Sequence, residues 1–85
     1  MENVTLSKHA KEQLLLREIS EELVWKILAE NKAYKVKDEL TVYHGLISEN
    51  NKSYLIRIFV NEKLNPHLII TVYKTSKVSK YESEI

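Results

Sequence analysis

The chain has no cysteine, one glycine and one proline among its 85 residues. Without cysteine it can form neither a disulfide framework nor a thiolate-bound metal site. With Gly45 as its single glycine, it cannot build a glycine-rich loop around a nucleotide phosphate. No apolar run approaches the roughly 20 residues that cross a bilayer, and the N-terminal segment lacks an apolar signal core. We therefore expect one cytoplasmic domain over residues 1–85, with no membrane segment and no cofactor.

Metal and serine chemistry are also poorly supported by the sequence. The three histidines, His9, His44 and His67, have no ligand-like spacing, so we expect no metal site. No serine sits in the G-x-S-x-G pattern of a strand-to-helix nucleophile elbow. With metal sites and serine nucleophiles poorly supported, the remaining candidates for catalysis are basic and phenolic side chains.

The N-terminal part of the chain predicts two amphipathic helices, over residues 8–17 and 21–30. Ser7 and Ser20 are placed to cap them, because a serine hydroxyl at the N-cap accepts an otherwise unpaired backbone N–H. Apolar residues recur at helical spacing and mark the buried stripes: Leu6, Ala10 and Leu14 in the first, and Leu23, Val24, Ile27 and Leu28 in the second. Since very few residues separate the helices, we expect a helical hairpin.

From residue 33 onward the hydrophobic period changes from about 3.6 to 2, which is typical of strands. Four strands are predicted, over residues 33–37, 40–47, 53–60 and 67–75, with turns at 38–39, 49–52 and 61–66. Connections this short join antiparallel neighbours. The predicted fold class is α+β, with two N-terminal helices packed on a small antiparallel meander of about four strands.

Alternation along the last two strands assigns their side chains to two faces of the sheet. We expect the helices to cover the aliphatic residues Ile56, Ile58, Ile70 and Val72. Arg57 and Tyr73 then lie on the opposite, more open face, as neighbours across paired strands. The sequence leaves the register open, and a one-residue slip would exchange the faces.

Positive charge is concentrated in the C-terminal part of the chain. Residues 51–85 contain six Lys or Arg and three Asp or Glu, and Lys74, Lys77 and Lys80 follow one another without an acid between them. Such a segment can bind phosphate, or it can be a solvated strand end and tail.

These basic and phenolic groups suit cleavage of RNA without a metal. Attack by a ribose 2′-OH needs a base, a cation for the developing oxyanion and an acid for the leaving oxygen. We assign the catalytic roles to His9, Arg57 and Tyr73. The residues assigned to RNA and its phosphates are Arg17, Lys74, Lys77, Lys80 and Tyr81. Local capping by His9 and pairing of Arg17 with a nearby glutamate are the alternatives for the two residues on the first helix.

Several short segments together resemble a known family: His9, residues 17–20, Val24, residues 54–57 and residues 71–77. In this order they resemble the domain of unknown function 4258 group, which is similar in layout to the BrnT, RelE and ParE toxins of bacterial toxin–antitoxin pairs. The resemblance implies an endoribonuclease toxin that a small antitoxin, encoded nearby, neutralises. ParE-like proteins of the same fold cleave nothing, so the resemblance also allows a non-enzymatic protein-binding module.

Overall fold

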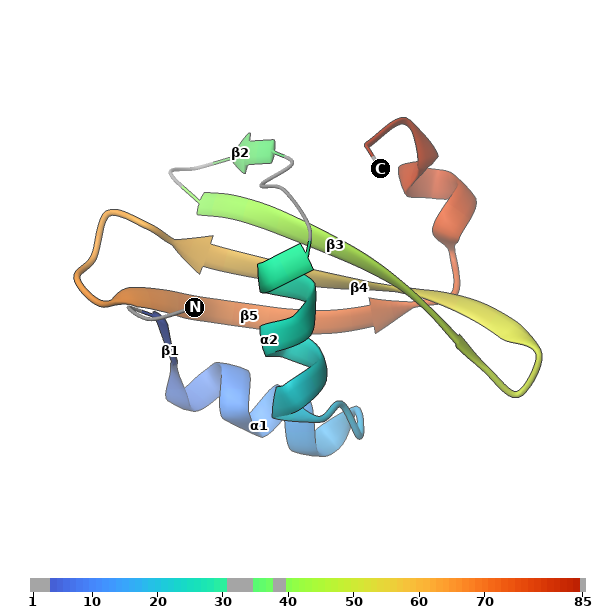
Figure 1. Ribbon diagram of the computed structural model, residues 1–85, viewed down its shortest axis with the longest axis horizontal. Coiled ribbons are helices and arrows are strands. Elements are labelled where there is room, and N and C mark those ends of the chain that lie inside the picture. Colours follow the sequence, from blue (N-terminus) through green and yellow to red (C-terminus); the bar gives the residue numbers. More distant parts are fainter. Residues whose placement is uncertain (1–3, 31–34, 38–39, 85) are drawn as a thin grey trace.

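The computed structural model describes residues 4–30, 35–37 and 40–84 and shows an α+β fold. One sheet has the strand order β1-β5-β4-β3-β2, with two α-helices ahead of most of its strands in the chain (Figure 1). The elements in chain order are β1 (Val4–Leu6), α1 (Lys8–Leu16), α2 (Glu21–Glu30), β2 (Lys35–Lys37), β3 (Leu40–Glu49), β4 (Lys52–Asn61), β5 (His67–Thr75) and the 3₁₀ helix η1 (Val78–Glu84).

Both helices begin where their capping serines predict. The Ala10 N–H donates to Ser7 Oγ at 3.0 Å, and the Leu23 N–H donates to Ser20 Oγ at 3.1 Å. α1 ends at Leu16, one residue earlier than predicted, and the chain then turns at Glu18, whose φ is 54°. The helix predictions are therefore confirmed to within one residue.

The two helices do not form the expected hairpin. α1 packs against β5 and β1, whereas α2 packs against β3 and runs across the strands (Figure 1). Each helix therefore buries its apolar stripe mainly against the sheet and not against the other helix.

The prediction of a purely antiparallel sheet is wrong, because β1 pairs in parallel with β5. This strand has three residues, too few to show a period, and its pairing partner lies more than 60 residues away in the chain. The predicted strand 33–37 overlaps β2, while residues 33–34 and the turn at 38–39 lie outside the described residues. The other three predicted strands are confirmed as β3, β4 and β5.

A two-residue turn fixes the register between β3 and β4. Asn50 and Asn51 have φ values of 51° and 63°, as a type I′ turn requires, and asparagine tolerates this left-handed conformation well. The strands on either side pair from Glu49↔Lys52 back to Thr41↔Val60 without a break.

A β-bulge between β4 and β5 makes one predicted face assignment wrong, that of Ile70. Phe59 pairs with Thr71, but the next residue, Val60, pairs with Ile69, so β5 contains one extra residue at this point. Ile69 is therefore the fully buried residue, whereas Ile70, predicted to lie in the core, is partly exposed. Alternation alone could not reveal this extra residue.

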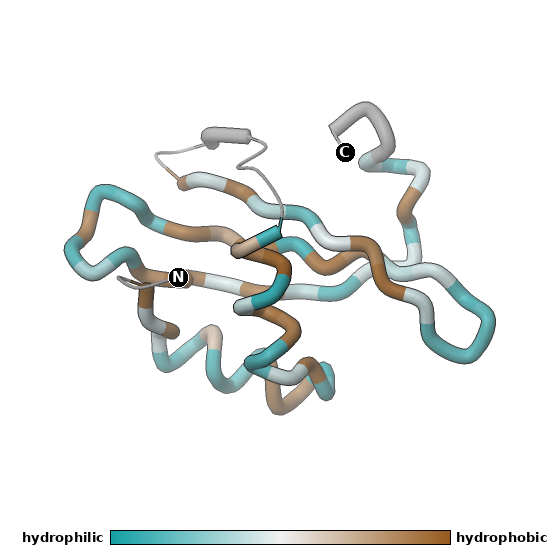
Figure 2. Tube along the Cα trace, viewed as in Figure 1, coloured by the Kyte–Doolittle hydropathy of each residue, from teal (hydrophilic) through white to brown (hydrophobic). Residues whose placement is uncertain are grey.

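The main core lies between the helices and one face of the sheet. Figure 2 shows hydrophobic residues along α2 and along the strand segments beside it. The buried members from the sheet include Tyr43, Ile56, Ile58, Ile69 and Val72. The opposite face is also partly closed, since Val42 and Leu55 on that face have no exposed surface. Among the described helices, none is long and apolar enough to span a membrane.

Gly45 allows α2 to approach β3 closely. A Cβ atom at this position would lie 2.5 Å from Ile27 Cγ1 and 2.6 Å from its Cδ1. We expect Gly45→Ala to lower the free energy of unfolding by about 1–3 kcal/mol through overpacking, measured by urea denaturation. In an Ile27→Ala background, where the clashing atoms are gone, the same substitution should cost clearly less. Equal costs in the two backgrounds would contradict this close contact.

Candidate functional site

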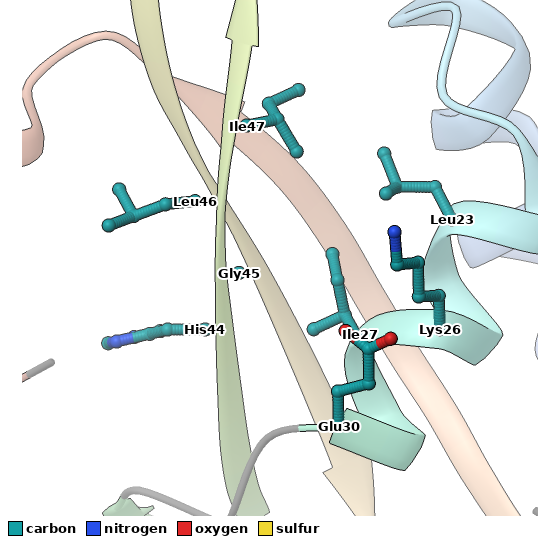
Figure 3. Close-up of a pocket in the computed structure, with 8 residues that line it drawn as sticks. All are labelled: Leu23, Lys26, Ile27, Glu30, His44, Gly45, Leu46 and Ile47. Atoms are coloured by element: carbon teal, nitrogen blue, oxygen red, sulfur yellow. The ribbon is translucent and has the colours of Figure 1, made fainter.

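One rung of the sheet brings three polar side chains together. His44 on β3 pairs with Arg57 on β4, and Arg57 pairs with Tyr73 on β5, so all three side chains lie on one face. This face is opposite α2, and His44 is seen pointing away from that helix in Figure 3. The prediction that Arg57 and Tyr73 are neighbours across paired strands is confirmed.

Arg57 is the centre of this group, which we call the Arg57 cluster: His44, Arg57, Phe59, Tyr73 and Tyr81. The guanidinium Nε donates a hydrogen bond to His44 Nε2 at 3.0 Å, and Nη1 donates one to the Tyr73 hydroxyl. The guanidinium carbon, Arg57 Cζ, lies 4.2 Å from the ring centroid of Tyr81, 5.1 Å from that of Phe59 and 5.5 Å from that of Tyr73. Both the plane and the edge of the guanidinium are thus held in place.

The described hydrogen-bond partners of Arg57 are neutral. A histidine nitrogen that accepts a hydrogen bond carries no proton, so His44 faces the guanidinium as an uncharged imidazole. Among the side chains that the structure describes, those of residues 4–30 and 40–81, no carboxylate forms an ion pair with Arg57. A half-buried cation whose described neighbours are neutral and aromatic groups can attract an anionic ligand.

The pKa values of the two phenols in the cluster are shifted in opposite directions. Tyr73 Oη lies 3.3 Å from Tyr81 Oη. Burial, followed by this hydrogen bond, raises the pKa of Tyr73, although Arg57 acts in the other direction. The hydrogen bond from Tyr73 lowers the pKa of Tyr81, and the charges of Lys80 and Arg57 lower it further. Tyr81 is therefore the phenol that loses its proton more easily, while Tyr73 keeps its own.

The C-terminal segment supplies Tyr81 to the cluster. After β5 the chain enters η1, which packs against β4 and so brings Tyr81 over Arg57. Lys80, next to it, is exposed, and its Nζ lies 5.5 Å from the Tyr81 ring centroid. Four of the residues proposed from the sequence are thus close together: Arg57, Tyr73, Lys80 and Tyr81.

The structure does not bring the other sequence-derived candidates to this cluster. His9 and Arg17 are exposed on and just after α1, which packs on β5 and β1. Lys74 lies on the face that carries the helices, where its Nζ contacts Glu49 Oε1 at 3.0 Å. Lys77 is exposed two residues after the end of β5. The lysines that are close in sequence therefore do not form one continuous patch with Arg57.

Sequence reasoning missed His44 and Phe59 as members of the cluster. The signal for His44 was present, because counting outward from a two-residue turn at Asn50 and Asn51 places it opposite Arg57. Phe59 lies two residues after Arg57 on the same strand face, and its ring stacks on Tyr73 with centroids 5.9 Å apart. Alternation along the strand places Phe59 on the face of Arg57, whereas His44 could be assigned only once the register was fixed.

A second polar group lies farther along the sheet, around Glu62. Its carboxylate accepts hydrogen bonds from Thr41 Oγ1 at 2.7 Å and from Tyr43 Oη at 2.8 Å. Burial and this carboxylate raise the pKa of Tyr43 to about 12. His67 Nδ1 lies 4.0 Å from the same carboxylate. These contacts tie the segment after β4 to β3, which is a structural role.

Comparisons of the chain with protein-family models, curated proteins and solved structures give no match. The described residues also contain no group of three or more His, Cys, Asp or Glu side chains placed to hold a metal ion. Function must therefore be inferred from the geometry of the Arg57 cluster.

Removing the Tyr73 hydroxyl tests the electrostatics of this cluster. We expect Tyr73→Phe to raise the pKa of Tyr81 toward its ordinary value, because the hydrogen bond that lowers it is lost. The measurement is an alkaline titration of phenolate absorbance, in which the difference from a matching Tyr81→Phe variant isolates Tyr81. Tyr54→Phe, on the other face of the sheet, is the control and should leave the titration of Tyr81 unchanged. An unaltered Tyr81 titration in Tyr73→Phe would contradict the proposed hydrogen bond.

Proposed function

We propose that the protein cleaves RNA without a metal and that the Arg57 cluster is its active site. The observation that carries this proposal is the guanidinium of Arg57, which is held by neutral partners beside a phenol of lowered pKa. A fixed cation next to a proton acceptor is the minimum that phosphodiester transesterification requires.

The cluster offers distinct contacts to the two parts of a nucleotide. Arg57 can bind a phosphate through a charge-assisted hydrogen bond, and the exposed Lys80 can add a second cation. The ring of Tyr81, partly exposed, presents an aromatic surface to an unpaired base. Because stacking needs an unpaired base, single-stranded RNA is the expected substrate class.

The phenols divide the proton transfers between them. Tyr81, in its deprotonated form, takes the proton of the ribose 2′-OH, whose oxygen then attacks the adjacent phosphorus. Arg57 stabilises the charge that develops on the phosphoryl oxygens. Tyr73, which stays protonated, supplies the proton for the leaving 5′ oxygen as the P–O5′ bond breaks. The products are a 2′,3′-cyclic phosphate and a 5′-hydroxyl.

The resemblance to RelE-like and BrnT-like toxins supports a biological role for this chemistry. Under the proposal the protein is the toxin of a toxin–antitoxin pair, and a small antitoxin encoded nearby neutralises it. The cluster combines Arg57 and Tyr73, both of which lie in segments that carry the resemblance, with a tyrosine from the C-terminal segment.

One observation favours the alternative of a non-enzymatic protein-binding module. Leu15 and Leu16, at the end of α1, are 81% and 82% exposed, which is unusual for two consecutive leucines in a small domain. A ParE-like inhibitor could use such a surface to hold a target protein. Under this alternative the Arg57 cluster is structural.

Cleavage of single-stranded RNA in the presence of a chelator separates the two functions. We expect fragments with 2′,3′-cyclic phosphate ends, and no cleavage of the same strand with 2′-deoxy sugars. Arg57→Ala and Tyr81→Phe should each lower the rate by about 10²-fold or more, the usual effect of losing a charge stabiliser or a general base. The rate should rise with pH until Tyr81 is deprotonated, since only the phenolate accepts the proton.

Two further variants serve as controls for this assignment. His9→Ala and Lys74→Ala remove candidates that lie away from the cluster, and we expect each to retain most of the parent rate. Thermal melts of every variant establish that the fold is intact. A fully active Arg57→Ala protein, or a parent protein with no cleavage, would reject the ribonuclease proposal and favour the protein-binding alternative.

A further inference from the structure

Among the described residues, no strand pairs with the outer edge of β3 beyond Val42. β2 pairs with β3 only from Leu40 to Val42, whereas β4 pairs with β3 along its length to Glu49. The second half of β3 therefore has a strand on one side only. Within the described part of the chain, nothing pairs with Leu46 or Ser48 on the other side.

The register shows which backbone groups face outward at this edge. In a hairpin closed by a two-residue turn, the residues that flank the turn exchange both hydrogen bonds, and the pattern then alternates along the ladder. Glu49 and Ile47 accordingly direct their N–H and C=O groups toward β4. Leu46 and Ser48 direct theirs outward, where a further strand would bond to them.

A groove follows the same edge on the side that carries α2. It has a volume of about 350 Å³ and lies between α2 and the second half of β3 (Figure 3). Leu23, Ile27 and Ile47 form its apolar wall, and Lys26 and Glu30 lie at its rim. This volume is at the low end of the ~300–1,000 Å³ of small-ligand pockets, which suits a side chain better than a cofactor.

We propose that this edge is a docking site for an extended segment of a partner protein, which adds to the sheet as a strand beside residues 45–49. The unpaired backbone groups specify an extended chain, because only a strand meets the N–H and C=O groups of alternate residues. Residues of the segment that face α2 place an apolar side chain in the groove, and the residues between them face the exposed Leu46.

The chemistry of the site favours a partner segment over a second copy of this chain. Two copies joined at this edge would pair the outward backbone groups of Leu46 and Ser48 from each chain, far fewer residues than the roughly 20–30 a side of a standard interface. A partner segment gains the groove in addition. The groove is lined by residues of α2 and β3, so it lies at the β3 edge of the hairpin and not at the opposite edge that contains Ser53.

The probe for this proposal is a random dodecapeptide display library, selected on the full chain. We expect the enriched peptides to alternate apolar and polar residues. Bound peptide should slow amide hydrogen exchange at Leu46 and Ser48, which exchange rapidly in the free protein, while Ile47 is slow in both states. N-methylation of the peptide nitrogens that face β3 should abolish binding. N-methylation of the intervening nitrogens, which face away from β3, should be tolerated.

Two serines on one rung provide matched variants. Ser48→Pro removes an outward N–H from the β3 edge, and Ser53→Pro removes one from the opposite edge of the same hairpin, without loss of a β3–β4 hydrogen bond in either case. We expect Ser48→Pro to weaken peptide binding about tenfold or more and Ser53→Pro to leave it unchanged. Leu23→Lys, which fills the groove with a charge, should weaken binding similarly if Ser48→Pro does not fold.

Several outcomes would overturn the proposal. These are a library without enriched peptides, equal effects of the two proline variants, or peptide-induced protection at Leu15 and Leu16 on α1 instead of the β3 edge. A dimer of the free protein that Ser48→Pro dissociates would identify a second copy as the occupant and would equally reject a partner segment. Because the Arg57 cluster is on the other face, these results are independent of whether the protein cleaves RNA.

Discussion

The register of the β3–β4–β5 ladder is the constraint on which the rest of the structure depends. Because side chains alternate along a strand, the Asn50–Asn51 turn decides at once which residues pack under α2 and which meet on the opposite face. Gly45 and Ile56 form one rung beneath Ile27, and the next rung gathers His44, Arg57 and Tyr73. A shift of one residue would bury Arg57 beneath α2 and expose the aliphatic core. The core therefore stabilises the arrangement of the polar cluster, although it does not touch it.

Burial of a charge without a counter-charge has an energetic cost that a structural arginine usually avoids by pairing with a carboxylate. The described residues place two charged groups among neutral hydrogen-bond partners on the same sheet. Glu62 receives hydrogen bonds from Thr41 and Tyr43, and these satisfy a partly buried charge with neutral donors in a purely structural arrangement. Among the described side chains, Arg57 has neutral acceptors and three aromatic rings around it, and none of these cancels its positive charge. Under the proposed function a phosphate supplies the missing charge at Arg57. The carboxylate of Glu62 would repel the same ligand, so the Arg57 cluster and not the Glu62 group is the candidate site.

The local parts of this fold could be predicted from the sequence, and the long-range parts could not. Ser7 and Ser20 cap their helices because capping depends on a few adjacent residues, and the three long strands follow from their period. β1 and the bulge opposite Phe59 depend on pairing between distant segments, which no local pattern records. For the same reason Arg57 and Tyr73 could be placed on one face by alternation, whereas His44 needed the register. The position of Tyr81 above Arg57 depends on the turn after β5, and its sequence neighbours do not specify it.

The distribution of the lysines shows why charge along the sequence is a poor guide to charge in space. Lys74 lies in β5 on the helix-bearing face and is occupied by Glu49, whereas Lys80 has passed the turn and lies beside Tyr81 over the opposite face. The lysines of this segment are therefore divided between two surfaces. The electrostatic potential at either surface is weaker than the number of lysines in the sequence suggests. If the protein cleaves RNA as we propose, its affinity must consequently come from close contacts at Arg57 more than from long-range attraction. Such a site would recognise the local shape of its ligand, a phosphate beside an unpaired base, because little of the binding energy would be independent of that geometry.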